Sequence, residues 1–111
     1  MIDGIRDSSI IQFMRTVIET PTFQNQADKL WSEDERFDFI AWIAVNSQAG
    51  DVIPGAEGAR KVRWSRPGIG KSGGVRVIYF NLTQEEVVFL VAVYAKANTS
   101  NMTPSQIKKA V

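Results

Sequence analysis

The sequence predicts an α+β protein: a small, mostly antiparallel sheet with one mixed edge, and two N-terminal helices packed on one of its faces. Two observations support this. Helix signals come first, between residues 20 and 50, and strand-like segments follow one another after residue 58. Helices grouped ahead of antiparallel strands are typical of layered α+β domains. With 111 residues, the chain is long enough for one domain with a modest core.

A strand and a short helix are the first predicted elements. Residues 15–19 form a run rich in β-branched residues that favours a strand, and Pro21 ends it. Thr22 is in place to cap a short helix, because a threonine side chain can accept a hydrogen bond from the first helical turn. We expect one domain over residues 14–111, with residues 1–13 either a loose extension or partly a short helix.

A longer helix is predicted to follow. Ser32 and Glu35 have the spacing of a capping box, in which each side chain accepts a hydrogen bond from the other residue's backbone. This helix is expected to run to about residue 47 and to be stopped by Gly50. Its apolar residues form a stripe that should pack on the sheet. The stripe consists of Phe37, Ile40, Ala41 and Ala44, widened by Phe39, Trp42 and Ile43.

The second half of the chain predicts a three-stranded meander and a last helix. The strands are expected at residues 59–65, 75–82 and 87–94, which are rich in β-branched and aromatic residues. Residues 52–55 look like a turn that leads into the first of them, and residues 83–86 form the hairpin turn between the last two. Thr103 is in place to cap a final helix that begins at Pro104.

The composition excludes several kinds of chemistry. The chain has no cysteine and no histidine. Disulfides, thiolate nucleophiles, thiolate or imidazole metal sites and histidine acid–base catalysis are therefore excluded, and no cofactor is expected. No apolar run approaches the ~20 residues of a membrane span, and the N-terminal residues do not resemble a signal peptide. We expect a cytoplasmic protein without membrane contact.

The net charge of +1 conceals an asymmetry between the two halves. Residues 1–50 carry a net charge of −4, and residues 51–111 carry +5. Six cations fall between Arg60 and Arg76, with no acid among them. An unbalanced basic segment of this kind suggests that the second half meets a polyanion.

A glycine-rich loop within this segment looks at first like a nucleotide site. Gly70-Lys71-Ser72 matches the end of a P-loop, but Ser65 occupies the position of the required first glycine. Residues 75–80 then predict a strand, whereas a P-loop needs a helix there to bind the phosphate. The P-loop is rejected. The loop still carries Arg66 and Lys71, and its glycines let the backbone approach a phosphate closely.

One face of the predicted sheet collects basic side chains. Successive residues of a strand point to opposite faces, so Lys61 and Arg63 share one face. If the next strand pairs with this one, Arg76 joins them as an exposed side chain, and Lys96 closes the surface just after the last strand. Such a face is either an ordinary solvated surface or a site for a polyanion. The polyanion is favoured, because no acid relieves the repulsion between these cations.

The same segments resemble a known family. Residues 58–64 (GARKVRW), 70–79 (GKSGGVRVIY) and 90–96 (LVAVYAK) resemble, in this order and spacing, the RelE/HigB toxins of type II toxin–antitoxin pairs. Residues 50–55 (GDVIPG) and 102–104 (MTP) are similar to the HigB branch in particular. The resemblance extends from about residue 14 to the C-terminus, and it rests on the set of motifs because no single one is diagnostic.

The resemblance implies a RelE-like toxin fold and an activity. Such a toxin enters the A site of the ribosome and cleaves the bound mRNA, without a metal or another cofactor. A cognate antitoxin with a helix-turn-helix DNA-binding domain is also implied. It either covers the basic face with an acidic segment or binds the helical side, where Asp34 and Asp38 lie. The acidic first half of the chain favours the helical side.

The resemblance also assigns roles to individual residues. The catalytic residues would be Lys61 and Arg63 as a basic pair on one strand, Arg76 as the clamp on the phosphate, and Lys96. Further RNA contacts would come from Arg60, Arg66, Lys71 and Tyr94. In this chemistry the 2′-hydroxyl attacks the adjacent phosphate, arginines stabilise the developing charge, and a lysine among cations can act as a base. Some relatives stack a C-terminal tyrosine on a base. Residues 101–105 contain none, so Tyr94 either takes this role or belongs to the core.

Other functions remain open at this point. ParE-like toxins share the fold and act on DNA gyrase, although they tend to lack the full basic set. A non-catalytic module that binds RNA or phosphate would use the same cations. A degenerate toxin that only binds its antitoxin would have the same sequence features.

Overall fold

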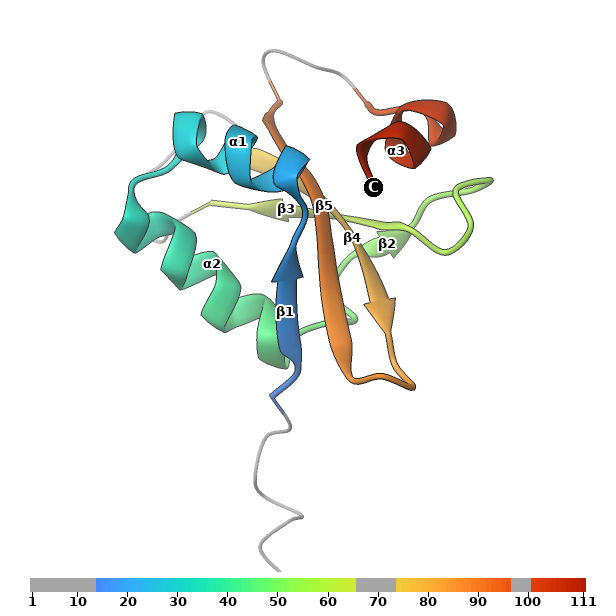
Figure 1. Cartoon of the computed structure of the whole chain (residues 1–111), viewed down its shortest axis with the longest axis horizontal. Helices are drawn as coiled ribbons and strands as arrows, with labels where there is room; N and C mark the ends of the chain where they lie inside the picture. The colour runs from blue at the N-terminus through green and yellow to red at the C-terminus, as the bar shows by residue number, and fades with distance from the viewer. Residues whose placement is uncertain (1–13, 66–73, 97–100) are drawn as a thin grey trace, which may run out of the picture.

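The computed structural model describes residues 14–65, 74–96 and 101–111, so the expectations for residues 1–13 lie outside the described residues. The elements are β1 (Thr16–Glu19), α1 (Pro21–Leu30), α2 (Glu33–Val45), β2 (Asp51–Val52), β3 (Arg60–Trp64), β4 (Val75–Leu82), β5 (Val87–Ala95) and α3 (Pro104–Ala110). The strands form one sheet in the order β1-β5-β4-β3-β2 (Figure 1). β1 runs parallel to β5, and the other neighbours are antiparallel. The predicted α+β class with a mixed edge is confirmed.

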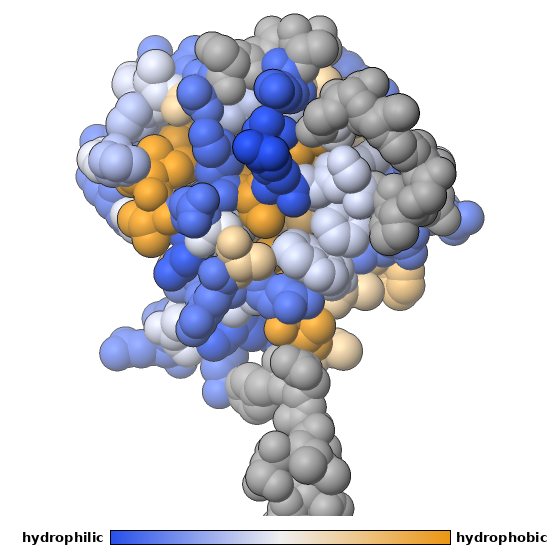
Figure 2. Space-filling model, turned by 180° about the vertical axis from the view of Figure 1, so that it is seen from behind, coloured by the Kyte–Doolittle hydropathy of each residue, from blue (hydrophilic) through white to orange (hydrophobic). Residues whose placement is uncertain are grey.

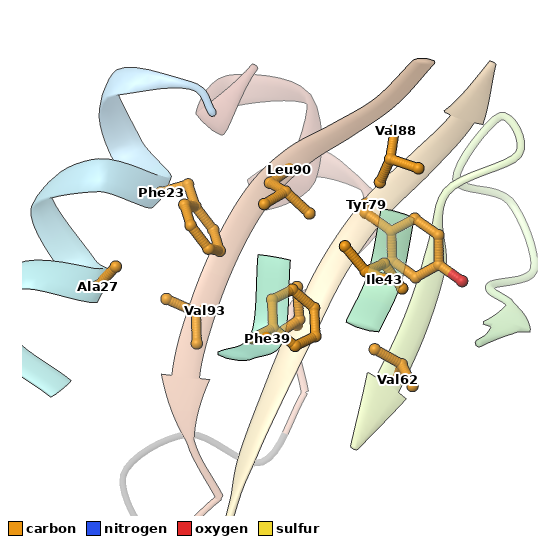
Figure 3. Packing of buried hydrophobic residues seen from close by; sticks show 10 residues of the cluster. Phe23, Ala27, Phe39, Ile43, Val62, Tyr79, Val88, Leu90 and Val93 are labelled. Atoms are coloured by element: carbon orange, nitrogen blue, oxygen red, sulfur yellow. The ribbon is translucent and has the colours of Figure 1, made fainter. Parts of the chain in front are cut away.

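Helices cover both faces of the sheet. α1 and α2 pack on one face, as predicted, and α3 lies on the other (Figure 1). The larger core lies beneath α1 and α2, where Phe23, Phe39, Leu90 and Tyr79 are fully buried between helices and strands (Figure 3). The smaller core lies beneath α3 and contains Ile107. Burial of large apolar side chains on both faces is the main stabilising contribution to this small domain.

α1 begins earlier than the sequence suggested. The N-cap is Thr20, whose side-chain oxygen accepts a hydrogen bond from the Phe23 N–H at 3.0 Å. Pro21 occupies the first turn, and the predicted cap, Thr22, lies inside the helix. The predicted cap is wrong because Pro21 begins the helix as well as ending the strand. Proline is well suited to the first helical position, where its missing N–H costs no hydrogen bond.

α2 begins with the predicted capping box. The Ser32 N–H donates to Glu35 Oε1 at 2.9 Å, and the Glu35 N–H donates to Ser32 Oγ at 3.2 Å. The helix ends at Val45 with Asn46 as its C-cap, earlier than expected, so Gly50 does not stop it.

The predicted apolar stripe of α2 is partly wrong. Phe37 is 69% exposed and Ala41 is also exposed, whereas Phe39, Ile43 and Ala44 are buried. The helix has apolar residues on nearly all sides, so the helical period alone could not select the face that meets the sheet. Tertiary packing makes that selection.

The segment between α2 and β3 contains a short strand, β2. It has only two residues, so the sequence could not predict it. Gly50 holds it in place, because its N–H donates to Tyr79 Oη at 2.9 Å. Tyr79 Oη in turn donates to the Ser47 carbonyl at 2.8 Å. A Cβ on Gly50 would lie 2.9 Å from the Lys61 carbonyl oxygen, so only glycine fits without a shift. Burial raises the pKa of Tyr79, against the lowering effects of the Gly50 backbone and the charge on Arg60.

An irregularity in β5 changes which side chains face which layer. In β4, Ile78 and Tyr79 are consecutive, but their partners in β5 are Ala92 and Leu90, so Val91 is an extra residue. Such a bulge reverses the alternation of side chains along the strand that carries it. Tyr94 consequently lies on the α3 side of the sheet, with the smaller core, although simple alternation from Leu90 would place it beneath α1 and α2.

The backbone groups near the bulge have partners from the first elements of the domain. The Thr20 hydroxyl donates to the Val91 carbonyl at 3.1 Å, and the Thr20 N–H donates to the Leu90 carbonyl at 3.1 Å. The Val93 N–H donates to Gln26 Oε1 at 2.8 Å. Because buried backbone groups need hydrogen bonds, these contacts stabilise the bulge.

Candidate functional site

The basic side chains of β3, β4 and the end of β5 line one groove on the α3 side of the sheet. Arg63 pairs with Arg76 across β3 and β4, so both side chains project from the same face. The groove has a volume of about 940 Å³, and its apolar lining residues are Trp42, Ala49 and Val62. Its polar and charged lining residues are Asp51, Lys61, Arg63, Arg76, Lys96 and Asn101. The structure thus brings together the four cations to which the sequence assigned catalysis.

Arg76 differs from its expected state. We predicted an exposed side chain, but Arg76 is only 7% exposed. It lies on β4, the middle strand of the sheet, with Arg63 opposite on β3 and Tyr94 opposite on β5. Neighbours on both sides cover most of the side chain, which explains the error. A cation buried at the floor of a groove acts more strongly on a bound anion than an exposed one, because the local dielectric is lower.

Tyr94 also lies at the floor of this face, beside Arg76. It is 7% exposed, and its hydroxyl makes no hydrogen bond of ordinary geometry with the described residues. Burial raises the pKa of Tyr94, against the lowering effects of the Met102 backbone and the charge on Arg76. Tyr94 belongs to the smaller core and is not among the described residues that line the groove.

Lys61 and Lys96 lie on two sides of the groove. Lys61 Nζ donates to Asn101 Oδ1 at 2.5 Å, which links β3 to the segment that precedes α3. Lys96 directly follows β5, where its N–H donates to the Gly74 carbonyl at 3.5 Å. Gly74 has a φ of 59°, and a side chain there would collide with the Trp64 carbonyl, so β4 can begin beside β3 only with glycine at this position.

Arg60 does not belong to the groove. It pairs with Tyr79 in the sheet and therefore faces the α2 side. Its Nη1 donates to the Gly50 carbonyl at 2.6 Å, so its observed contact is with the loop that follows α2. The other two predicted RNA-binding residues, Arg66 and Lys71, lie outside the described residues.

Sequence reasoning missed two polar residues of the groove. Asp51 pairs with Lys61 between β2 and β3, so an acid lies among the cations. Asn101 comes from beyond β5. To place Asp51 in the groove, the sequence would have had to predict β2. That strand has only two residues, which is too short to show the alternation of a strand. The contact of Asn101 is purely tertiary, and no local pattern predicts it.

The groove can bind a polyanion. Four cations converge on it, and two of them are arginines, whose planar guanidinium groups suit phosphate oxygens. From behind, hydrophilic side chains gather across the middle of the molecule and hydrophobic ones form separate patches (Figure 2). Within the described ranges, no cluster of three or more acids could hold a metal ion. None of the described helices is long and apolar enough to cross a membrane.

Comparison with known proteins identifies the fold. No family model matches the chain. A solved structure of the toxin RelE from E. coli, a double arginine-to-alanine mutant in the free state, superposes with a TM-score of 0.60. The alignment covers 88% of this chain and 98% of that chain at 16% sequence identity. The chain has the RelE toxin fold. At this identity the similarity shows a shared fold only, so any activity has to be inferred from the chemistry of the groove.

Proposed function

We propose that this protein is the toxin of a type II toxin–antitoxin system and that it cleaves mRNA on the ribosome. The observation that carries the proposal is the groove, which gathers Lys61, Arg63, Arg76 and Lys96 on one face of a RelE-type sheet. The chain has no histidine, so RNA cleavage would depend on these cations. The HigB-like motifs further suggest the HigB branch.

The proposed reaction is an in-line transfer within the RNA. The 2′-hydroxyl attacks the adjacent phosphate, and negative charge develops on the non-bridging oxygens. Arg63 and the buried Arg76 stabilise this charge, and a lysine ammonium of the groove protonates the departing 5′ oxygen. A flexible RNA must also be held in line, and binding on the ribosome supplies this order. Cleavage should therefore depend on the ribosome.

The helical side offers a separate surface for the cognate antitoxin. Phe37 is 69% exposed on α2, beside Glu33 and Asp34, and none of these three residues lines the groove. An antitoxin segment with an apolar anchor and basic residues would fit it. Docking there would inhibit by preventing access to the ribosome. Charge reversal of Asp34 combined with Phe37→Ala should weaken antitoxin binding. If rescue of growth by the antitoxin is unchanged, the antitoxin covers the basic groove instead.

Expression in bacteria with and without the antitoxin tests the proposal. Growth should stop without the antitoxin, and mapping of mRNA 5′ ends should show cuts in phase with codons. Arg63→Ala should remove both effects. Arrest with intact mRNA would contradict the proposal and would point to gyrase or another target.

A further inference from the structure

Asp51 is the one acidic residue among the described residues that line the groove, which also include four cations. β2 pairs with β3 so that Asp51 lies opposite Lys61, and paired residues of adjacent strands project from the same face. Both residues line the groove with Arg76 and Lys96. A negative charge here opposes RNA binding, so its presence calls for a chemical explanation.

Neutralisation of Lys61 does not supply that explanation. Lys61 Nζ contacts Asn101 at 2.5 Å, and no cation of the described residues lies within ion-pair distance of Asp51. Asp51 is exposed in the groove. Its carboxylate is thus available to a bound substrate.

The backbone at Asp51 is held firmly. The preceding residue, Gly50, donates its N–H to Tyr79 Oη and accepts a hydrogen bond from Arg60 through its carbonyl. Lys61 holds the other side through the pairing of β2 with β3. Residues that act in catalysis must be fixed by such supporting contacts, because small displacements reduce the rate strongly.

We infer that Asp51 is the general base of the proposed RNA cleavage, an inference that rests on the proposed function. The proton of the 2′-hydroxyl passes to the Asp51 carboxylate as the 2′ oxygen forms its bond to phosphorus. The bond from phosphorus to the 5′ oxygen breaks, and that oxygen takes a proton from the ammonium of Lys96. The products are a 2′,3′-cyclic phosphate and a 5′-hydroxyl. Solvent then returns both side chains to their starting charge.

A carboxylate suits this role better than a lysine does. Carboxylates are ionised at neutral pH, whereas an ammonium must first lose its proton before it can accept another. The chain has no histidine to take the proton instead. With Asp51 as base, no lysine of the groove has to lose its proton before the reaction, so all four cations are charged as the phosphorane forms and can stabilise it.

Single-turnover cleavage of ribosome-bound mRNA by the full chain tests this assignment. Asp51→Asn keeps the size of the side chain but removes the base, and the cleavage rate should fall about 10²-fold or more. Binding to the ribosome should be unchanged or tighter, because a repulsive charge is gone. Asp51→Glu should restore part of the rate. Glu85→Gln, an exposed acid in the β4–β5 turn, is the matched control and should cleave like the wild type.

The pH dependence separates a base from a structural residue. The rate of the Asn variant should rise about tenfold per pH unit as hydroxide replaces the base, and the wild-type rate should depend less steeply on pH. An Asn variant that cleaves within about threefold of wild type, or whose pH profile stays parallel to it, overturns the inference while the proposed function stands. A wild-type protein that does not cleave overturns the proposed function itself.

Discussion

Two arginines on β3, Arg60 and Arg63, lie on opposite faces of the sheet. Removal of Arg63 should therefore lower the cleavage rate, and removal of Arg60 should lower the stability of the fold. Arg63 is exposed in the groove and makes no hydrogen bond or ion pair with the described residues. Arg63→Ala should therefore change the free energy of unfolding by no more than about 0.5 kcal/mol. The cleavage rate should fall about 10²-fold, because a contact to the developing phosphorane charge is lost.

Arg60→Ala should show the reverse. Its guanidinium bonds the Gly50 carbonyl at 2.6 Å and reaches the Gln48 carbonyl at 3.5 Å. Hydrogen bonds from a charged donor contribute about 1.5–3 kcal/mol, and partial exposure of Arg60 reduces this to about 1–2 kcal/mol. Chemical denaturation and single-turnover cleavage below the melting temperature measure the two effects. If Arg60→Ala stays as stable as wild type but loses activity, or Arg63→Ala keeps full activity, the assignment of the two faces is wrong.

Three further predictions concern buried contacts. Thr20→Val removes both the cap of α1 and the hydrogen bond from the Thr20 hydroxyl to the Val91 carbonyl. The free energy of unfolding should fall by about 1–3 kcal/mol, and thermal unfolding should show a Tm lower by about 4 °C or more. Tyr79→Phe should cost about 1–3 kcal/mol at pH 7, where the hydroxyl bonds both Ser47 and Gly50. The pKa of Tyr79 is raised in the folded state, so the wild type should lose stability relative to this variant as the pH rises above about 10. If the difference in the free energy of unfolding between the two proteins does not change with pH, the pKa of Tyr79 is not raised. Arg76→Ala should lower stability by about 1–3 kcal/mol as well as abolish activity, because Arg76 is buried, and urea unfolding that matches wild type would contradict this.

Elements with strong local signals could be predicted from the sequence. The capping box at Ser32 lies where its spacing indicates, and Thr103 caps α3 as predicted. The bounds of β4 match the expected residues 75–82, because β-branched and aromatic residues between turn signals define a strand locally. Alternation along β3 and β4 was also sufficient to place Arg63 and Arg76 on one face.

Features that depend on tertiary packing could not be predicted. The exposure of Phe37 follows from the choice of one face by an almost uniformly apolar helix. The position of Tyr94 follows from the bulge at Val91, which reverses the alternation and is stabilised by Thr20 from a distant part of the chain. The position of Asp51 in the groove could not be predicted, because its strand, β2, is too short to show a strand pattern in the sequence. Each of these results from contacts between residues far apart in the sequence.

Cleavage by the purified protein, compared with and without ribosomes, tests the central claim most directly. One mRNA is supplied either alone or on ribosomes stalled with a defined codon in the A site, and its fragments are sequenced at their 5′ ends. The account predicts cuts within that codon on ribosomes, little cleavage of the free RNA, and cleavage about 10²-fold slower with Arg63→Ala. Intact mRNA on ribosomes treated with the folded wild-type protein, or equal cleavage of free RNA, would contradict it.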